Sequence, residues 1–272
     1  MSSTGSRDFY PNLEHQWIET NGLRLHTVQA GPADGPLVVL LHGFPEFWWS
    51  WRQQIGPLAE AGYRVAAPDQ RGYNTSDKPA NLSAYRLDVL AKDIAGLIEA
   101  LGRDKAYVVG HDWGGVVAWA VAVLHPGRVD KLAVLNAPHP GAVFGTLPAH
   151  PEQISRSRYM YFFQIPVLAE AVLRNNNWEP LVASMRRSSR SGTFRAEDFE
   201  QYRSAWWKKG AMTAMLNWYR ALFRRPYFLP VTPHLQMPVL ILWGARDFAL
   251  GRALAEASLR LCENGRLVFF EE

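Results

Sequence analysis

Short apolar runs alternate with longer amphipathic stretches through the first half of the chain. The run Leu37–Leu41 is apolar throughout, as in a strand buried on both faces of a parallel sheet. Three further runs have this character: Arg64–Pro68, Lys105–Val109 and Lys131–Leu135. Helix candidates lie between the runs: Trp51–Ala61, Leu87–Leu101 and Trp113–Leu124. Strands that alternate with helices predict an α/β fold with a mostly parallel, doubly wound sheet.

The same sheet is expected to gain strands at both ends of the chain. Trp17–Thr20 and Leu23–Gln29 are predicted to form a hairpin around the turn Asn21-Gly22. Near the end of the sequence the α/β pattern resumes with strand Pro238–Trp243, helix Arg252–Leu261 and strand Arg266–Phe270. Residues 1–138 and 233–272 are therefore predicted to form one α/β core.

Residues 139–232 interrupt this pattern. They contain no buried-strand run, only helical periodicity rich in Trp, Tyr, Phe and Arg. One predicted helical face comprises Met212, Met215, Leu216, Tyr219 and Leu222. Ligands of doubly wound sheets bind beyond the carboxyl ends of the strands. The inserted segment is therefore expected to form a helical cap over the active site.

The segment Gly110–Gly115 (Gly-His-Asp-Trp-Gly-Gly) joins a predicted buried strand to a predicted helix. This is the context of a nucleophile elbow, a sharp turn in which small residues flank the nucleophile. Asp112 holds the position that serine usually occupies. Taken alone, an aspartate before a helix is better explained as an N-cap.

Two other segments favour a catalytic Asp112 over a helix cap. His42–Pro45 (His-Gly-Phe-Pro) follows the apolar strand Leu37–Leu41, where hydrolases with such an elbow place an oxyanion-hole loop. Asp247 follows a late strand, where the acid of a catalytic triad is expected, and the order of nucleophile before acid fits the same fold. The three segments together predict a carboxylate nucleophile at Asp112.

These motifs resemble those of the α/β-hydrolase-fold epoxide hydrolases. The resemblance runs from about Trp17 over nearly the whole chain and is carried by these segments: His42–Glu46, Trp49–Arg52, Asp69–Gly72, Gly110–Gly115, Tyr159–Pro166 and Leu216–Arg220. It implies the α/β-hydrolase fold with a helical cap, and hydrolysis of an epoxide to a vicinal diol without a cofactor or metal. It also implies that two cap tyrosines, matched by Tyr159 and Tyr219, point at the nucleophile.

The residue types fit this chemistry. A carboxylate can attack saturated carbon, and Asp112 is ionised at neutral pH because an unperturbed aspartate has a pKa of about 3.9. Epoxide opening leaves an alkoxide, to which the phenols of Tyr159 and Tyr219 could donate. Without the resemblance, both tyrosines are better explained by packing, since aromatic residues at helical spacing usually belong to the core. Further expected site residues are Phe44 and Trp113 in the oxyanion hole, and His42, Pro45 and Trp113 along the substrate pocket.

Hydrolysis of an ester on Asp112 needs a histidine that activates water, oriented by Asp247 and later in the chain than it. No histidine follows His234 in the sequence, and His139 and His234, near the ends of the insertion, are poor candidates. The final residues Phe269–Glu272 lie within the expected last strand. The resemblance implies a histidine a few residues later and a final helix, so a further carboxyl-terminal segment is expected.

Two other functions are compatible with an aspartate elbow. A haloalkane or haloacid dehalogenase uses the same nucleophile but has no need of two tyrosine donors. A non-catalytic receptor on the same fold would not need the histidine, since a fold alone does not guarantee activity. The combination of Asp112, Asp247 and the tyrosine pair favours the epoxide hydrolase.

Composition limits the partners. The 11 tryptophans suit an apolar ligand site and thus a small apolar epoxide, with water as the second substrate. The net charge of +4 comes partly from the runs Arg186–Arg190 and Phe223–Arg225, but no nucleic-acid-reading motif accompanies it. The single cysteine, Cys262, excludes an intrachain disulfide. The segment Met1–Arg7 is polar and lacks the apolar pattern of a secretory signal. No apolar run is long enough to span a membrane. A cytoplasmic enzyme without a membrane partner is predicted, and a homodimer is left open.

Overall fold

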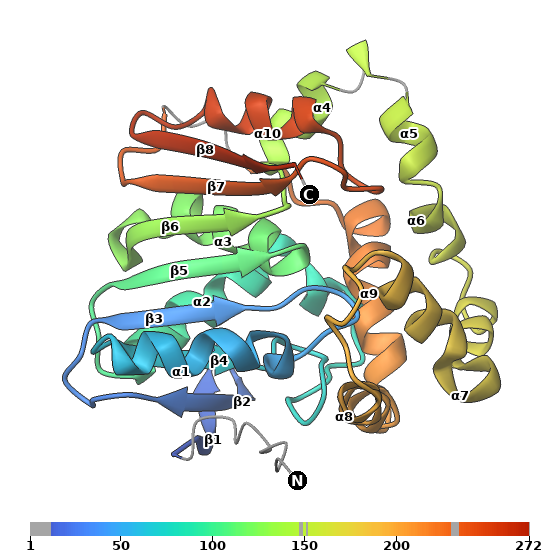
Figure 1. The fold of residues 1–272 in the computed structure, drawn as a ribbon, viewed down its shortest axis with the longest axis horizontal. Helices are drawn as coiled ribbons and strands as arrows, with labels where there is room; N and C mark the ends of the chain where they lie inside the picture. The colour runs from blue at the N-terminus through green and yellow to red at the C-terminus, as the bar shows by residue number, and fades with distance from the viewer. Residues whose placement is uncertain (1–11, 147–148, 151, 230–233, 272) are drawn as a thin grey trace, which may run out of the picture.

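The computed structural model describes residues 12–146, 149–150, 152–229 and 234–271, so the expectation about Met1–Arg7 lies outside the described residues. Among the described residues, eight strands form one sheet in the order β1-β2-β4-β3-β5-β6-β7-β8 (Figure 1). The strands are β1 (Glu14–Thr20), β2 (Leu23–Ala30), β3 (Leu37–Leu41), β4 (Arg64–Pro68), β5 (Ala106–His111), β6 (Val129–Leu135), β7 (Val239–Gly244) and β8 (Gly265–Phe270).

The sheet is antiparallel at one edge and parallel elsewhere. Strand β1 pairs with β2, and β2 with β4, in antiparallel fashion, whereas all pairs from β4 to β8 are parallel. Asn21 and Gly22 both have positive φ, 47° and 75°, as the tight turn between β1 and β2 requires. Strand β1 begins three residues before the predicted Trp17, because an exposed edge strand gives no apolar signal there. The predicted doubly wound, mostly parallel sheet is confirmed.

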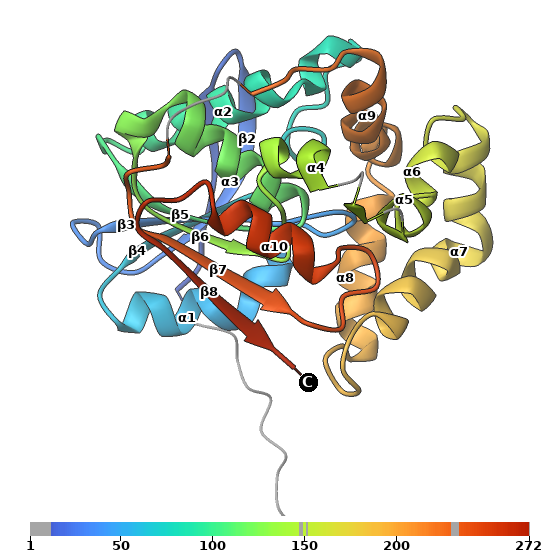
Figure 2. The ribbon, with the colours of Figure 1, turned by 90° about the horizontal axis from the view of Figure 1, so that it is seen from above.

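Helices cover both faces of the sheet. Helix α1 lies on one face, and α2 and α3 lie on the other (Figure 2). Helix α3 follows β5 directly and is buried along nearly its whole length, which fits its almost wholly apolar sequence. The core helices are α1 (Arg52–Glu60), α2 (Leu87–Ala100), α3 (Trp113–Leu124) and α10 (Arg252–Leu259), with short 3₁₀ turns at Trp48–Trp51, Leu82–Tyr85 and Pro126–Arg128.

The remaining helices lie between β6 and β7 in the sequence. They are α4 (Pro140–Thr146), α5 (Glu152–Arg156), α6 (Tyr159–Phe162), α7 (Leu168–Arg187), α8 (Ala196–Trp206) and α9 (Ala211–Arg224). Helix α7 is interrupted where Asn175–Trp178 leave the helical region. Helices α5 to α9 stand beside the carboxyl ends of the parallel strands (Figure 1). Among the described residues, no helix is both long enough and apolar enough to cross a bilayer.

One predicted helical face is confirmed in part. On α9, Met212, Met215, Leu216 and Tyr219 are buried, but Leu222 is 39% exposed. The exception has a physical reason, because Leu222 lies near the end of the helix and lines a cavity there.

The inserted helices are tied to the core by buried polar contacts. Each contact joins a side chain of one part to a group of the other: Trp206 Nε1 to Pro45 O (2.6 Å), Trp218 Nε1 to Arg71 O (3.0 Å) and Arg52 Nε to Asp198 Oδ1 (2.9 Å). Indole N–H groups buried against apolar neighbours need such acceptors. These contacts fix the inserted helices over the strand ends, where the candidate site lies.

Candidate active site

Asp112 lies in the turn between β5 and α3. Its backbone has φ 51° and ψ −123°, a region that costs a non-glycine residue about 1–3 kcal/mol. The carboxylate Oδ1 accepts a hydrogen bond from the backbone N–H of Phe44 (2.8 Å), and the N–H of Trp113 also donates to the carboxylate. Asp112 holds the N-cap position of α3, but its side chain accepts no capping hydrogen bond from the helix amides beyond Trp113, so the interpretation of this carboxylate as a side-chain cap is wrong.

Glycine is required where this turn meets the end of β3 and the loop that follows it. A Cβ atom on Gly43 would lie 2.4 Å from Asp112 Cβ and 2.6 Å from Asp112 Oδ1. A Cβ atom on Gly114 would lie 2.1 Å from Leu41 O. No side chain fits at such distances, so these glycines allow the Phe44 amide to reach the carboxylate.

The charge of Asp112 is set by its surroundings. Burial raises the pKa of Asp112, while the neighbouring His111 cation and the two backbone N–H groups counteract part of that rise. His111 Nδ1 lies 3.2 Å from Glu46 Oε2. Burial disfavours the His111 cation, but the hydrogen bond and charge of Glu46 outweigh it and raise the pKa of His111 to about 9. A protonated imidazole therefore stands beside the carboxylate at neutral pH.

Tyr159 and Tyr219 line the same cavity as Asp112. Tyr219, on α9, is 3% exposed, and its ring meets those of Phe44 and Trp113 edge-on at 5.3 and 5.1 Å between centroids. The Tyr159 ring, at the start of α6, lies 6.0 Å from the Tyr219 ring. Burial raises the pKa of both phenols, and the charge of Asp112 adds to the rise. Both tyrosines therefore stay protonated over the whole physiological range.

The cavity above Asp112 has a volume of about 650 Å³ and a mainly apolar lining. Its lining includes Trp113, Val116, Met160, Trp218, Leu250 and Leu254. This volume and character suit a small apolar ligand.

His42 and Pro45 were expected along the substrate pocket, but they do not line this cavity. His42 is wholly buried, and its ring nitrogens lie 3.0 Å from Gly43 O and 3.1 Å from the Gln70 backbone N–H. Burial lowers the pKa of His42, so the ring is neutral. Both residues are buried within the loop that presents Phe44, so they shape this loop and do not contact the cavity.

Asp247 lies in the loop after β7. Its Oδ1 accepts from the backbone N–H groups of Ala249 (2.8 Å) and Leu250 (2.9 Å), and its Oδ2 accepts from Asn136 Nδ2 (2.6 Å). The Oδ1 atom of Asn136 in turn accepts from Gly244 N (2.9 Å). Asn136 thus joins the carboxyl ends of β6 and β7 and holds one carboxylate oxygen of Asp247.

Sequence reasoning missed Asn136. Its position directly after a buried strand was the available signal, and its φ of 44° suits asparagine better than most residues. The signal is weak, because asparagine is common in turns for backbone reasons alone.

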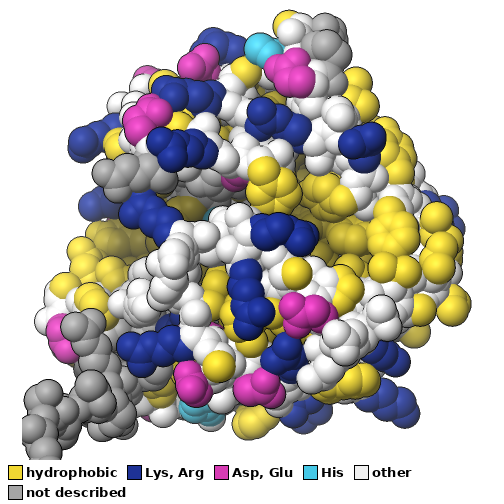
Figure 3. All heavy atoms as spheres, turned by 45° about the vertical axis from the view of Figure 1, so that its right-hand side comes forward, with side chains coloured by type: hydrophobic (Ala, Val, Ile, Leu, Met, Phe, Trp, Pro, Cys, Tyr) yellow, Lys and Arg dark blue, Asp and Glu magenta, His cyan; other side chains and the backbone are white. Residues whose placement is uncertain are grey.

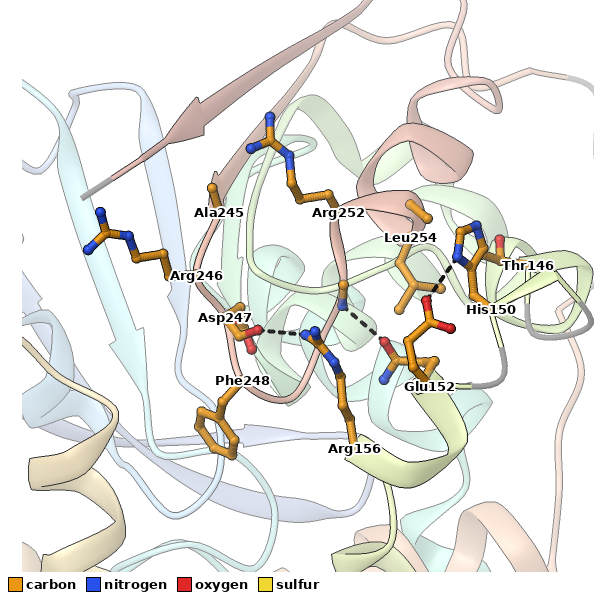
Figure 4. Close-up of a pocket in the computed structure, with 13 residues that line it drawn as sticks. Thr146, His150, Glu152, Arg156, Ala245, Arg246, Asp247, Phe248, Arg252 and Leu254 are labelled. Carbon is orange, nitrogen blue, oxygen red and sulfur yellow. Dashed lines mark hydrogen bonds and ion pairs between the residues drawn. The ribbon is translucent and has the colours of Figure 1, made fainter.

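A second cavity, of about 560 Å³, lies on the other side of the Asp247 loop (Figure 4). Arg156 donates to the backbone carbonyl of Asp247 there (2.9 Å), and His150 pairs with Glu152 (3.0 Å). Asp247 borders this polar cavity and is not among the residues that line the Asp112 cavity.

The hydrogen bonds of Asp247 within the described residues include none from a histidine. Burial lowers the pKa of His139 to about 4, its Nδ1 accepts from Gly141 N, and it is not among the hydrogen-bond partners of Asp247. Within the described ranges, no cluster of three or more His, Cys, Asp or Glu side chains could hold a metal ion.

Comparisons with known proteins agree with this geometry. The family model described as alpha/beta hydrolase fold matches residues 36–272. The AB hydrolase superfamily protein YfhM of Bacillus subtilis (strain 168) is 48% identical over 257 residues, which cover 94% of this chain and 90% of the relative. Epoxide hydrolase 2 of Caenorhabditis elegans is 39% identical over 261 residues, which cover 94% of this chain and 73% of the relative.

Solved structures give the same result. The crystal structure of a Bacillus megaterium epoxide hydrolase in complex with an inhibitor has a TM-score of 0.86 at 32% identity, covering 94% of this chain and 92% of that chain. The crystal structure of Epoxide Hydrolase A from Mycobacterium thermoresistibile has a TM-score of 0.81 at 33% identity, and the match covers 95% of this chain and 91% of that chain. The chain therefore belongs to the α/β-hydrolase-fold epoxide hydrolase family.

Proposed function

We propose that this protein hydrolyses epoxides to vicinal diols through a covalent ester on Asp112. The observation that carries this proposal is that one apolar cavity holds a carboxylate on its core side and two protonated tyrosines on its helical side. Relatives named as epoxide hydrolases support it. In this proposal residues 139–232 act as the cap of a core formed by residues 1–138 and 233–272, and the enzyme is cytoplasmic.

In the first step Asp112 attacks a ring carbon of the epoxide. The new carbon–oxygen bond forms the ester as the ring carbon–oxygen bond breaks. Tyr159 and Tyr219 donate hydrogen bonds to the ring oxygen, and one phenol proton passes to the developing alkoxide. Burial favours this role, because it keeps both phenols neutral until the far more basic alkoxide forms.

In the second step water attacks the carbonyl carbon of the ester. The oxyanion that forms is stabilised by donors already directed at Asp112, the backbone N–H groups of Phe44 and Trp113. Activation of this water also needs a histidine oriented by the triad acid, the role assigned to Asp247, and none of the described histidines donates to Asp247. The bond between the ester carbonyl carbon and the alkyl oxygen then breaks. Of the two protons of the water, one goes to the departing diol oxygen and the other restores the phenol, so the Asp112 carboxylate and both tyrosines are regenerated.

Single turnover in heavy-oxygen water tests this route. The first diol should carry an unlabelled oxygen from Asp112, and label should then enter the Asp112 carboxylate. Diol labelled fully from solvent in the first turnover would exclude the ester.

Dehalogenation is the alternative that shares the nucleophile. Departure of a halide needs no proton, so the two protonated phenols on the helical side of the cavity favour epoxide opening. We therefore expect diol formation without halide release when an epoxide and a haloalkane of equal size are compared.

A further inference from the structure

The inserted helices carry an exposed apolar face. Four consecutive residues, Ile165–Leu168, run from the α6–α7 connection into the first residue of α7; all are exposed, and Val167 reaches 79%. Val172 follows one helical turn after Leu168, and the Tyr161 ring lies 5.5 Å from the Phe223 ring. We define the apolar face by its large exposed side chains: Tyr161, Ile165, Val167, Leu168, Val172 and Phe223. Figure 3 shows hydrophobic side chains gathered broadly on this side of the molecule.

This face is continuous with the mouth of the Asp112 cavity. Tyr161 and Phe223 belong to both, and the exposed residues Ile154 and Leu222 extend the mouth. A connected apolar surface of this kind marks an interaction site, whereas scattered exposed apolar residues do not.

Arginines border the apolar face. Arg158 precedes Tyr161 by one helical turn, and Arg224 follows Phe223 and donates to the carbonyl of Gln164. Arg225 lines the cavity mouth. In the parts of the chain that the structure describes, none of these three guanidinium groups is paired with a carboxylate. The border of the face is therefore positively charged.

Val167 is held in an unfavourable conformation at the centre of this face. Its φ of 68° makes a β-branched residue strained. Because Val167 is 79% exposed, its contacts with the rest of the chain offset little of that strain. Neither folding nor the proposed chemistry thus explains an apolar side chain at this position.

We propose that the apolar face docks on an anionic lipid surface, from which apolar epoxides enter the cavity directly. Apolar side chains inserted at the interface and arginines beside anionic headgroups are the two contributions that hold a peripheral protein there. The second half of the proposal rests on the proposed function. A second copy of the chain fits less well, because a two-fold contact would bring the arginines of both copies together. The sequence predicted no membrane partner because it contains no apolar run long enough to cross a bilayer. Docking on the surface of a bilayer does not need such a run.

Vesicle sedimentation tests the docking. The protein should bind vesicles of phosphatidylcholine mixed with phosphatidylglycerol, and the double variant Val167→Asp/Leu168→Asp should bind at least about tenfold more weakly. The variant should fold, because aspartate tolerates positive φ and is favourable in the first turn of a helix. The control is Trp17→Asp, which places one aspartate on an exposed apolar residue of β1, outside the apolar face, and should bind like the wild type.

The arginines are tested separately. Arg158→Glu/Arg224→Glu should weaken binding to the mixed vesicles, as should high salt, whereas Arg260→Glu on the exposed end of α10 should not. Equal binding of the wild type and the Val167/Leu168 variant, or no wild-type binding at low salt, would overturn the proposal. The proposal would also be overturned if sedimentation velocity showed that the wild type is a dimer and the Val167/Leu168 variant is a monomer. The apolar face would then join two copies of the chain.

Activity separates docking from catalysis. The Val167/Leu168 variant should hydrolyse dissolved styrene oxide at the wild-type rate, but should act several-fold more slowly on a long-chain epoxyalkane held in mixed vesicles. If the wild type hydrolyses neither substrate, the proposed function is wrong, while vesicle binding still decides whether the face docks on lipid.

Discussion

The two walls of the Asp112 cavity are built in different ways. On the core wall, backbone groups make the decisive contacts, since Gly43 lies against Asp112 and the Phe44 N–H reaches its carboxylate. On the helical wall, Tyr159 and Tyr219 are placed by ring-to-ring packing among other aromatic side chains. The core wall therefore depends on the absence of side chains, and the helical wall on their shape.

This difference separates what is fixed from what is adjustable. A backbone contact without room for a Cβ atom tolerates no larger residue, so the nucleophile and its N–H donors have one arrangement. Aromatic packing can be rearranged by neighbouring substitutions at a modest cost. Substrate preference should therefore vary through the helical wall, while the chemistry of Asp112 stays constant.

The largest effect is expected from removing the nucleophile on the core wall. Asp112→Asn keeps the shape but lacks a nucleophilic carboxylate, and diol formation should fall by at least about 10⁴-fold. Because burial raises the pKa of Asp112 and so disfavours its charge, the variant should melt no lower than the wild type. Retained turnover with an intact melting transition would show that Asp112 is not the nucleophile.

Removing both phenols tests the helical wall. Tyr159→Phe/Tyr219→Phe should slow alkylation of Asp112 by at least about 10³-fold, and each single variant by about 10²-fold or less. Rapid-quench measurement of the ester gives these rates, with Tyr107→Phe at the start of β5 as the control. Single variants as active as the wild type would remove the tyrosines from the mechanism.

A single methyl group tests the backbone contact. Gly43→Ala must push the loop away from Asp112 and break the Phe44 hydrogen bond, which should cost about 10²–10³-fold in kcat. Gly127→Ala is the matched control, because a Cβ atom there meets nothing within 4 Å. Equal turnover of the two variants would show that the core wall can adjust to a Cβ atom at Gly43.

Asn136 contributes to the core wall through Asp247. Asn136→Gly keeps the backbone at φ 44° but removes both amide hydrogen bonds, so the free energy of unfolding should fall by about 1–3 kcal/mol. Asn136→Ala should lose more, since alanine is strained at positive φ. Urea denaturation of the two variants compares the hydrogen bonds with the backbone conformation. Equal stabilities of the two variants would show that Asn136 stabilises the protein through its side-chain amide hydrogen bonds and that its positive φ contributes nothing.

The smallest effect is electrostatic. Alkylation needs ionised Asp112, so its rate falls as the pH drops through the raised pKa of that carboxyl. His111→Gln removes a cation that lowers this pKa, so the acid limb of the rate profile should move to higher pH, by less than about one unit. A shift to lower pH would contradict the assigned charge of His111.

The same contrast explains what sequence reasoning could predict. The elbow was visible because the glycines at 110, 114 and 115 are a direct consequence of backbone crowding around Asp112. The directions of the His42 and Pro45 side chains were not visible, because a strand end allows either side of the sheet and packing decides between them. Asn136 was missed for a related reason, since its partners come from β7, more than a hundred residues later.

The indole hydrogen bonds of Trp206 and Trp218 to core carbonyls have a kinetic consequence. Swinging α8 and α9 away as a lid would break both bonds, at about 1–3 kcal/mol for each buried group left unsatisfied. We therefore expect substrate and product to exchange through the cavity mouth, where exposed side chains such as Leu222 and Phe223 can rotate on the picosecond-to-nanosecond scale. Turnover should then be less dependent on the slower microsecond-to-millisecond motions that limit enzymes with moving lids.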